Sequence, residues 1–424
     1  MLALTPLIFF ICVYLGVSIM LGDFYKVPIS VAFLLTAIVA ILVSKGTLKH
    51  RIKVFSRGGG SENLLLMIWI FILAGAFANS AKEMGSIDDM VSLTLGFVPS
   101  DTIFAGLFIA SAVISLSIGT SVGTVVALMP IAVGIASTVG TEVPAVAAIV
   151  VGGAFFGDNL SFISDTTVCA TQTQGCRMSD KFKTNLRIAL PAAVLVVIYY
   201  AVTGDSVSTP ANLPEVKLLK VLPYIVVLVT AMLGVDVLVV LAGGTLLTGI
   251  VGMYYGDYTI VTWFQAMADG IMGMGELIII TMLAGGVLEV IRANGGIRFV
   301  MDKILAHVHS ERTAELSIAA LVSFVDVCTA NNTVAIITVA GIAKDISHKY
   351  GLDPRRVASI LDTFSCIVQG VIPYGAQLLM GAALASISPV QIIPHLYYPY
   401  ALFFFALAAI LIPRLAGERV RSKV

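Results

Sequence analysis

An apolar part of the chain is interrupted by Gly157-Asp158-Asn159-Leu160-Ser161-Phe162-Ile163-Ser164-Asp165-Thr166-Thr167. The interruption places two carboxylates, one amide and four hydroxyls inside a segment, 145–174, that is otherwise mostly apolar. We predict that this segment forms a helix that breaks at the polar residues. The composition of the whole chain indicates whether such a break lies in a soluble core or in a membrane.

The composition indicates a membrane protein. Hydrophobic residues make up 58% of the 424 residues and charged residues 12%, with a mean hydropathy of +1.00, which excludes a soluble protein. Long apolar windows recur, so we predict an all-α polytopic membrane protein with about ten spans. The windows cover 4–20, 27–43, 64–79, 190–202, 221–232, 235–251, 271–291 and 397–411.

The distribution of basic residues predicts the orientation in the membrane. Cytoplasmic loops carry an excess of Lys and Arg, and five cationic clusters are therefore predicted to be cytoplasmic, together with both termini. The clusters are Lys45, Lys49, Arg51, Lys53 and Arg57; Arg177, Lys181, Lys183 and Arg187; Arg292, Arg298, Lys303 and Arg312; Lys344, Lys349, Arg355 and Arg356; and Arg414, Arg419, Arg421 and Lys423.

Four segments with polar interruptions differ in how they meet the membrane. Segment 314–343 has a cationic cluster at each end, so we predict a re-entrant hairpin, whereas 357–386 crosses the membrane. In the first half the corresponding segments meet the membrane from the opposite side, because the acidic loop at 88–101 faces outward. There, 103–136 forms the hairpin and 145–174 crosses inward.

The two halves thus contain the same parts in opposite orientation. We predict a single transporter domain, 1–424, with inverted repeats at 63–202 and 271–413, each holding one re-entrant hairpin and one broken membrane-spanning helix. Secondary transporters with this architecture bind their substrates near the midplane, where the repeats meet. The alternative to inverted repeats is that two kinked helices resemble each other by chance.

The breaks are the candidate binding sites, because irregular backbone at membrane depth needs partners from protein, water or a bound ion. A charge there costs about 2.5–3.5 kcal/mol, so the aspartates require a cation, a proton or water. Oxygen ligands suit Na⁺, and a buried carboxylate can exchange a proton for a cation. The predicted first-half residues are Asp158, Asn159, Ser161, Ser164, Asp165 and Thr166, with Na⁺ at Asp158 and Asp165, and the hairpin residues Thr120, Ser121 and Thr124.

The second half offers dipoles with little charge. Asp362 is either a second protonatable group or a residue near the cytoplasmic surface, and roles for Glu276 and Asp326 are left open. The predicted second-half residues are Asn331, Asn332, Thr333, Asp362, Thr363, Gln369, Pro373, Gly375 and Gln377. A competing interpretation is that all these polar groups merely cap the half-helices.

The interruption resembles the NhaC family of sodium/proton antiporters, within the ion transporter superfamily, whose members show a G-D-x-x-S-P-x-S-D-T-T-like stretch. The matching residues are Gly157, Asp158, Ser161, Ser164, Asp165, Thr166 and Thr167. The resemblance extends over most of the chain and implies Na⁺-linked exchange, with Asp158 and Asp165 handling cations or protons. Phe162 replaces the usual proline, and Tyr374-Gly375 follows Pro373 where the family often has Trp-Asn, which leaves ion selectivity open.

We therefore predict a Na⁺/H⁺ antiporter of the cytoplasmic membrane. The alternatives are a Na⁺- or H⁺-coupled transporter or exchanger of a small carboxylate or amino acid, and a passive channel. An enzyme is not expected, because the P-loop, GxSxG, HExxH and membrane aspartyl protease motifs are absent from the sequence. No nucleic-acid partner is predicted, since the net charge is zero. No cofactor is predicted either. The partners are Na⁺, H⁺ and the bilayer, with an organic anion or amino acid and a homodimer left open.

Overall fold

The computed structural model describes residues 2–21, 28–97, 99, 102–162, 164–204 and 215–412, and within these ranges the chain forms helices and no strand. The helices of the first half are η1 (Leu2–Leu4), α1 (Thr5–Leu21), α2 (Ile29–Val43), α3 (Leu48–Gly59), α4 (Glu62–Glu83), α5 (Ser86–Phe97), α6 (Ile103–Ile118), α7 (Ser121–Val139), α8 (Val143–Leu160), α9 (Asp165–Gln174) and α10 (Met178–Gly204).

The remaining helices are α11 (Leu218–Met232), α12 (Val237–Tyr255), α13 (Ile260–Gly273), α14 (Gly275–Ala293), α15 (Gly296–Leu305), α16 (Glu311–Thr329), α17 (Asn332–Tyr350), α18 (Pro354–Gln369), α19 (Ala376–Leu384), α20 (Pro389–Ile392), η3 (Ile393–His395) and α21 (Tyr397–Leu411). The predicted cationic tail at 414–423 and Asp101 of the acidic loop lie outside the described residues.

Six helical segments of the described chain are long and apolar enough to cross a membrane. They are Leu64–Glu83, Ser121–Val139, Val143–Gln174, Met178–Thr203, Val237–Tyr255 and Ile260–Ala293. Five shorter apolar helices accompany them. The prediction of an all-helical, multi-pass membrane protein is confirmed.

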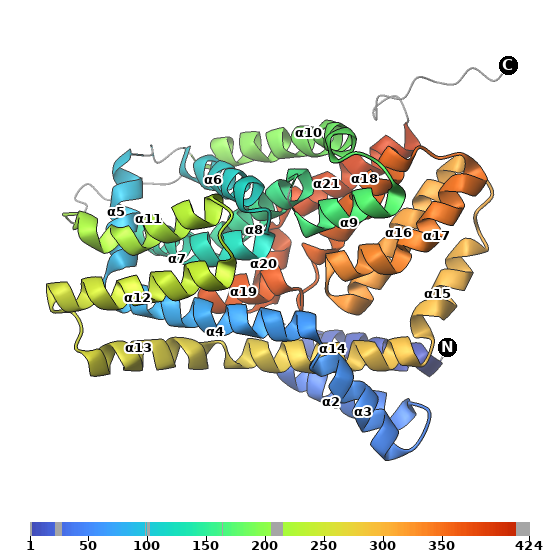
Figure 1. Cartoon of the computed structure of the whole chain (residues 1–424), viewed down its shortest axis with the longest axis horizontal. Coiled ribbons are helices and arrows are strands. Elements are labelled where there is room, and N and C mark those ends of the chain that lie inside the picture. Colours follow the sequence, from blue (N-terminus) through green and yellow to red (C-terminus); the bar gives the residue numbers. More distant parts are fainter. Residues whose placement is uncertain are drawn as a thin grey trace.

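Two helices extend beyond the predicted windows. Helix α10 begins at Met178, well before the predicted start at 190. The predicted span 271–291 covers the end of α13 and most of α14, and α13 itself begins earlier, at Ile260. Both extensions contain polar residues, such as Lys181 and Asp269, which lower the hydropathy of a window without preventing a helix. In Figure 1, α13 and α14 run end to end along one side of the molecule.

Helices α6 and α8 pack closely because small residues meet at their crossing. The hydroxyls of Ser111 and Ser115 donate to the carbonyls of Val150 and Ala154, both over 2.6 Å. A Cβ atom on Gly157 would lie 2.3 Å from the Cβ of Ser115. Small residues and interhelical hydrogen bonds are the usual means by which membrane helices associate. This crossing fixes the last turn of α8, where the polar interruption starts.

Replacing Gly157 by Ala is expected to lower the free energy of unfolding by about 1–3 kcal/mol, because the new methyl group must push α6 away from α8. Thermal unfolding in detergent measures the change. The matched control is Gly243→Ala in α12, where no heavy atom lies within 4 Å of the added Cβ. The control is expected to keep or raise stability, and equal stabilities of the two variants would contradict the close crossing.

Two helix pairs share a common geometry at their junctions. Helices α6 and α7 meet at Gly119, with φ 75°, and α16 and α17 meet at Ala330, with φ 49°. Each of these left-handed residues is followed by an extended residue that precedes the next helix. In Figure 1, α6 and α7 lie toward the left and α16 and α17 toward the right, with α8 between them.

Candidate functional site

One cavity of about 140 Å³ is lined by both helix-pair junctions and by both interrupted helices. Its lining residues are Met67, Gly119, Thr120, Ser121, Val122, Asp158, Ser164, Asp165, Thr166, Ala330, Asn331, Asn332, Thr333, Gln369, Ala376 and Gln377. Segments that are far apart in the sequence therefore converge on one space, and most of the predicted polar residues line it.

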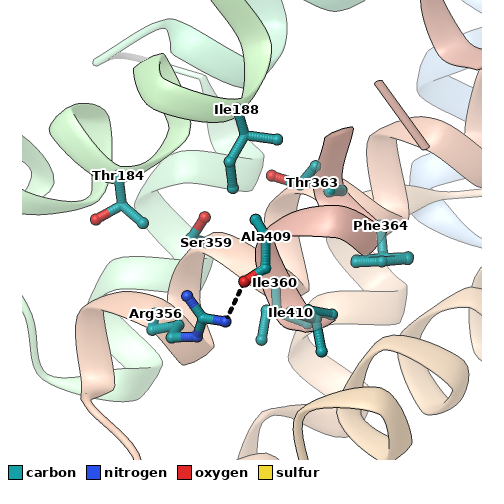
Figure 2. Close-up of a pocket in the computed structure, with 10 residues that line it drawn as sticks. Thr184, Ile188, Arg356, Ser359, Ile360, Thr363, Phe364, Ala409 and Ile410 are labelled. Atoms are coloured by element: carbon teal, nitrogen blue, oxygen red, sulfur yellow. Dashed lines mark hydrogen bonds between the residues drawn. The ribbon is translucent and has the colours of Figure 1, made fainter. Parts of the chain in front are cut away.

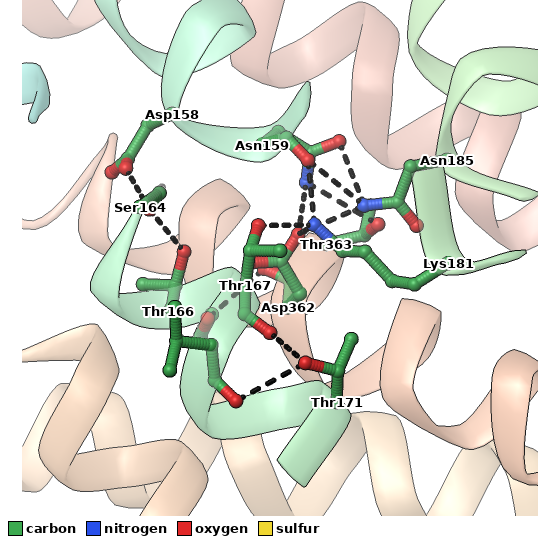
Figure 3. A network of polar contacts seen from close by, with 12 residues as sticks. Asp158, Asn159, Ser164, Thr166, Thr167, Thr171, Lys181, Asn185, Asp362 and Thr363 are labelled. Atoms are coloured by element: carbon green, nitrogen blue, oxygen red, sulfur yellow. Dashed lines mark hydrogen bonds and ion pairs between the residues drawn. The ribbon is translucent and has the colours of Figure 1, made fainter. Parts of the chain in front are cut away.

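Asp158 is the most enclosed carboxylate of this cavity, with 5% of its surface exposed. Ser121 donates to its Oδ2 over 2.9 Å, and Ser164 donates to its Oδ1 over 2.5 Å. The hydroxyls of Ser164 and Thr166 are 2.9 Å apart (Figure 3). Asp165, the first residue of α9, also lines the cavity but is exposed. Two hydroxyl groups thus contact the carboxylate of Asp158, and the hydroxyl of Thr166 adjoins them.

A chain of amides connects this cluster to the second half. Gln377 Nε2 donates to the Ser121 hydroxyl over 2.9 Å, and Gln369 Nε2 donates to Gln377 Oε1 over 3.0 Å. Gln369 Nε2 also donates to the carbonyl of Ala330 over 3.1 Å. A left-handed alanine costs about 1–2 kcal/mol, and this hydrogen bond helps to hold it. These hydrogen bonds link the two helix-pair junctions with the break between α8 and α9 and the break between α18 and α19; we refer to these four places as the four junctions.

Helix capping accounts for only part of this polarity. Asn331 caps α17 by accepting from the N–H of Val334 over 3.0 Å. Thr120 and Ser164, which stand at the N-cap positions of α7 and α9, make no such side-chain hydrogen bond. The Ser164 hydroxyl is instead directed at Asp158. Capping therefore does not explain the residues around this carboxylate.

A second polar cluster is buried beside the first and is built around an ion pair. Lys181 Nζ lies 2.6 Å from Asp362 Oδ2, and these side chains are 1% and 0% exposed. Lys181 also donates to the Asn159 carbonyl and to the Thr167 hydroxyl, both over 2.7 Å. Asn185 donates to Asp362 Oδ2 over 2.8 Å (Figure 3). Asp362 is thus buried inside the protein and paired with a cation.

Comparison with known proteins identifies the family of the chain. The model of the Na⁺/H⁺ antiporter family matches residues 3–204 and 206–416. The chain belongs to this family. Membership makes it a transporter and not an enzyme, in agreement with the prediction from the sequence.

The names of individual relatives of this chain differ in the ions or molecules transported. The chain is 25% identical over 391 residues to the Na⁺/H⁺ antiporter NhaC of Bacillus subtilis, covering 83% of this chain and 84% of that protein. It is 23% identical over 437 residues to the malate-2H⁺/Na⁺-lactate antiporter of the same species, covering 93% and 92%. Among solved structures, the Alcanivorax borkumensis YdaH transporter has a TM-score of 0.41 and 12% identity, covering 87% of this chain and 88% of that one.

Two basic residues predicted to lie in cytoplasmic loops of this antiporter-family chain are in fact buried. Lys181 pairs with Asp362, and Arg356 pairs with Glu315. Charge counting could not distinguish them from exposed neighbours, because their acidic partners lie on other helices. Asn185, one turn after Lys181, was also missed. Its spacing from Lys181 on one helix face is the only sequence signal.

Several predicted residues of the first half lie near the cavity without lining it. Ser161 donates to the carbonyl of Leu116 over 3.2 Å, and Thr124 donates to that of Thr120 over 3.0 Å. Asn159 belongs to the cluster around Lys181. These residues contact the breaks but are not among the residues that line the cavity.

Two predicted residues of the second break and Glu276 lie away from the cavity, whereas Gln369 and Gln377 of the same break line it. Pro373 and Gly375 lie in the turn between α18 and α19, where the N–H of Gly375 donates to the carbonyl of Ile372 over 3.0 Å. Glu276 is exposed and accepts a hydrogen bond from Ser30 over 2.8 Å. None of the three lines the cavity.

A small cavity of about 10 Å³ lies among α10, α18 and α21 (Figure 2). The hydroxyl-bearing residues Thr184, Ser359 and Thr363 line it, and Arg356 at its edge donates to the carbonyl of Ala409 over 2.7 Å. Such a volume holds about one water molecule. Thr363 also contacts Asn159 of the second polar cluster. The small cavity therefore lies between this cluster and the ion pair of Arg356 with Glu315.

Proposed function

We propose that this chain exchanges Na⁺ for H⁺ across the cytoplasmic membrane and that Asp158 binds the two ions in turn. The observation that carries the proposal is the enclosed carboxylate of Asp158, which lies where all four junctions meet. The hydroxyls of Ser121, Ser164 and Thr166 supply further oxygen atoms around it. Carboxylate and hydroxyl oxygens are the ligands that hard cations prefer.

The state of Asp362 supports Asp158 as the exchanging group. Both carboxylates are buried, and a buried carboxylate is stable only when a cation or a proton compensates its charge. Lys181 already compensates Asp362. Among the described residues, Asp158 accepts hydrogen bonds only from neutral hydroxyls, so we infer that its charge is met by Na⁺ or by H⁺. Binding of one ion then excludes the other, which is the requirement of an antiporter.

The order and lengths of the helices support the two inverted repeats at 63–202 and 271–413. Helices α4 to α10 and α14 to α21 follow one another as a long helix, a short helix, a helix pair, an interrupted helix and a final apolar helix. The members of the two helix pairs have 16 and 19 residues in the first half and 19 and 19 in the second. We infer that the pairs are re-entrant hairpins of opposite orientation, with both termini cytoplasmic.

The amide chain gives a means of coupling binding to motion. Gln377 reaches Ser121 across the two halves, and Ser121 donates to Asp158. Exchange of Na⁺ for a proton at Asp158 alters the hydrogen bond that Ser121 donates to this carboxyl group. The hydrogen bond from Gln377 to the Ser121 hydroxyl then changes as well. We propose that the repeats move around Asp158 and expose it alternately to either side of the membrane.

A second candidate function is exchange or coupled transport of a small organic anion. The cavity of about 140 Å³ is larger than a bare cation requires, because about 10–15 Å³ by this measure already holds one water molecule. The name of the Bacillus subtilis malate-2H⁺/Na⁺-lactate antiporter shows such cargo in a relative. Either several waters or a small carboxylate would fill the remaining space.

Transport in reconstituted liposomes tests the proposal. An inward Na⁺ gradient is expected to make the lumen of liposomes containing the protein alkaline, as reported by an enclosed pH-sensitive dye, without any organic acid. Protein-free liposomes are the control. Proton movement that appears only after addition of malate or lactate would favour the second candidate. No Na⁺-dependent proton movement under either condition would contradict Na⁺/H⁺ exchange.

A further inference from the structure

Asp326 is a buried carboxylic acid outside the cavity. It lies on α16, one turn before the left-handed Ala330, and none of its surface is exposed. Within the described part of the chain, neither side-chain oxygen of Asp326 has a hydrogen-bond partner, and Asp326 is absent from the ion pairs. An ionised carboxylate without partners would cost several kcal/mol in such a place.

The surroundings of Asp326 offer no compensating charge. The ionisable side chains near it are those of Cys328 on the same helix and Tyr374 in the turn after α18. The hydroxyl of Tyr374 donates its hydrogen bond to the carbonyl of Val327 over 2.8 Å and not to Asp326. The N–H of Gln369 lies beside the carboxyl group without hydrogen-bond geometry.

Charged residues on the packed helices are directed elsewhere. On α18, Asp362 is paired with Lys181 and Arg356 with Glu315. On α17, the first charged residue is Lys344, about 15 Å further along the helix pair than Asp326 at 1.5 Å per residue. Among the described residues, no charged group acts on Asp326.

The corresponding position of the first helix pair is occupied differently. Ser115 precedes Gly119 as Asp326 precedes Ala330, and each accepts the N–H of that left-handed residue through its own carbonyl, over 2.8 and 2.7 Å. The Ser115 hydroxyl is paired, since it donates to the carbonyl of Ala154. A serine is thus sufficient at this position of a helix pair. The structure of the helix pair therefore does not explain why the second half has an acid, Asp326, there.

We propose that Asp326 binds a second transported proton, separate from the proton that competes with Na⁺ at Asp158. The proposal rests on the Na⁺/H⁺ exchange proposed above. A proton fits better than Na⁺, because Asp326 does not line the cavity and lacks the further oxygen contacts of a metal site. The adjoining Ala330 and Gln369 do line the cavity, so movement of this junction during exchange connects Asp326 with water.

The stoichiometry of exchange tests this site. With two protons moved per Na⁺, exchange by the wild type carries net charge, so a membrane potential set with potassium and valinomycin is expected to change its rate. The isosteric Asp326→Asn variant is expected to exchange one proton per Na⁺ and to lose this voltage dependence. The matched control, Asp345→Asn, changes an exposed acid of α17 and is expected to behave as the wild type.

Two results would overturn the second proton site. They are a wild type whose exchange ignores the membrane potential, and an Asp326→Asn variant whose voltage dependence equals that of the wild type. Infrared difference spectroscopy adds a measurement that does not need transport. In saturating Na⁺, which keeps Asp158 ionised, the carbonyl-stretch band of a protonated carboxyl group is expected in the wild type and should be lost in Asp326→Asn, and its persistence in the variant contradicts the assignment. If the wild type moves no protons at all, Na⁺/H⁺ exchange fails, while the infrared band still decides whether Asp326 carries a proton.

Discussion

Replacing Asp158 by Asn is expected to lower the initial rate of Na⁺-dependent proton movement by about 100-fold or more while the protein stays folded. The variant keeps the shape of the side chain but removes both the negative charge that attracts Na⁺ and the group that binds the proton. Loss of one partner from a buried charge pair costs about 3–5 kcal/mol, which corresponds to at least about 100-fold in binding. Dye-loaded liposomes measure the rate, and size-exclusion chromatography in detergent checks the fold.

Asp165→Asn is the matched comparison for this experiment. Asp165 lines the same cavity but is exposed, so solvent screens its charge. Its replacement is expected to raise the half-saturating Na⁺ concentration about two- to tenfold and to leave the maximal rate nearly unchanged. An Asp158→Asn variant that retains a rate close to that of the wild type would remove Asp158 from the mechanism. A complete loss in Asp165→Asn alone would shift the binding site to the mouth of the cavity.

Replacing Lys181 by Met is expected to lower the free energy of unfolding by about 3–5 kcal/mol. The substitution leaves Asp362 buried without its cation and removes two further hydrogen bonds, to Asn159 and Thr167. Met has similar length and apolar character, so little packing is lost. Thermal or denaturant unfolding in detergent measures the effect.

Lys183→Met on the same helix is the control for Lys181, because Lys183 is exposed. Its replacement is expected to change the free energy of unfolding by less than about 1 kcal/mol. The double variant Lys181→Met with Asp362→Leu removes both charges, and it is expected to recover much of the stability lost in Lys181→Met. If the double variant loses as much free energy of unfolding as Lys181→Met and Asp362→Leu lose together, the ion pair is not the source of the effect.

Hydropathy and the polar interruption were sufficient to predict the helical membrane class and most of the cavity. Windows at 27–43 and 235–251 correspond closely to α2 and α12, because each is almost purely apolar. Asp158 and Ser164 were recognised because polar oxygens are costly at membrane depth. They needed no tertiary information, since one broken segment supplies both residues.

The second polar cluster could not be predicted from local sequence. Lys181 looked like a loop residue because four basic residues lie close together at 177–187, and its acidic partner belongs to another helix far along the chain. For the same reason, local sequence does not distinguish a buried position of Asp362 from one near the cytoplasmic surface. Only the packing of α10 against α18 brings these side chains together. Such long-range pairs are invisible to periodicity and charge counting.

Competition between Na⁺ and protons at Asp158 is tested most directly by Na⁺ binding to the purified protein at different pH values. Isothermal titration calorimetry in buffers of different ionisation enthalpy measures both the affinity and the protons released. At acidic pH, the apparent Na⁺ affinity is expected to fall about tenfold per pH unit, with one proton released per Na⁺ bound. A Na⁺ affinity that does not change with pH, with no proton released, would contradict alternate binding at Asp158.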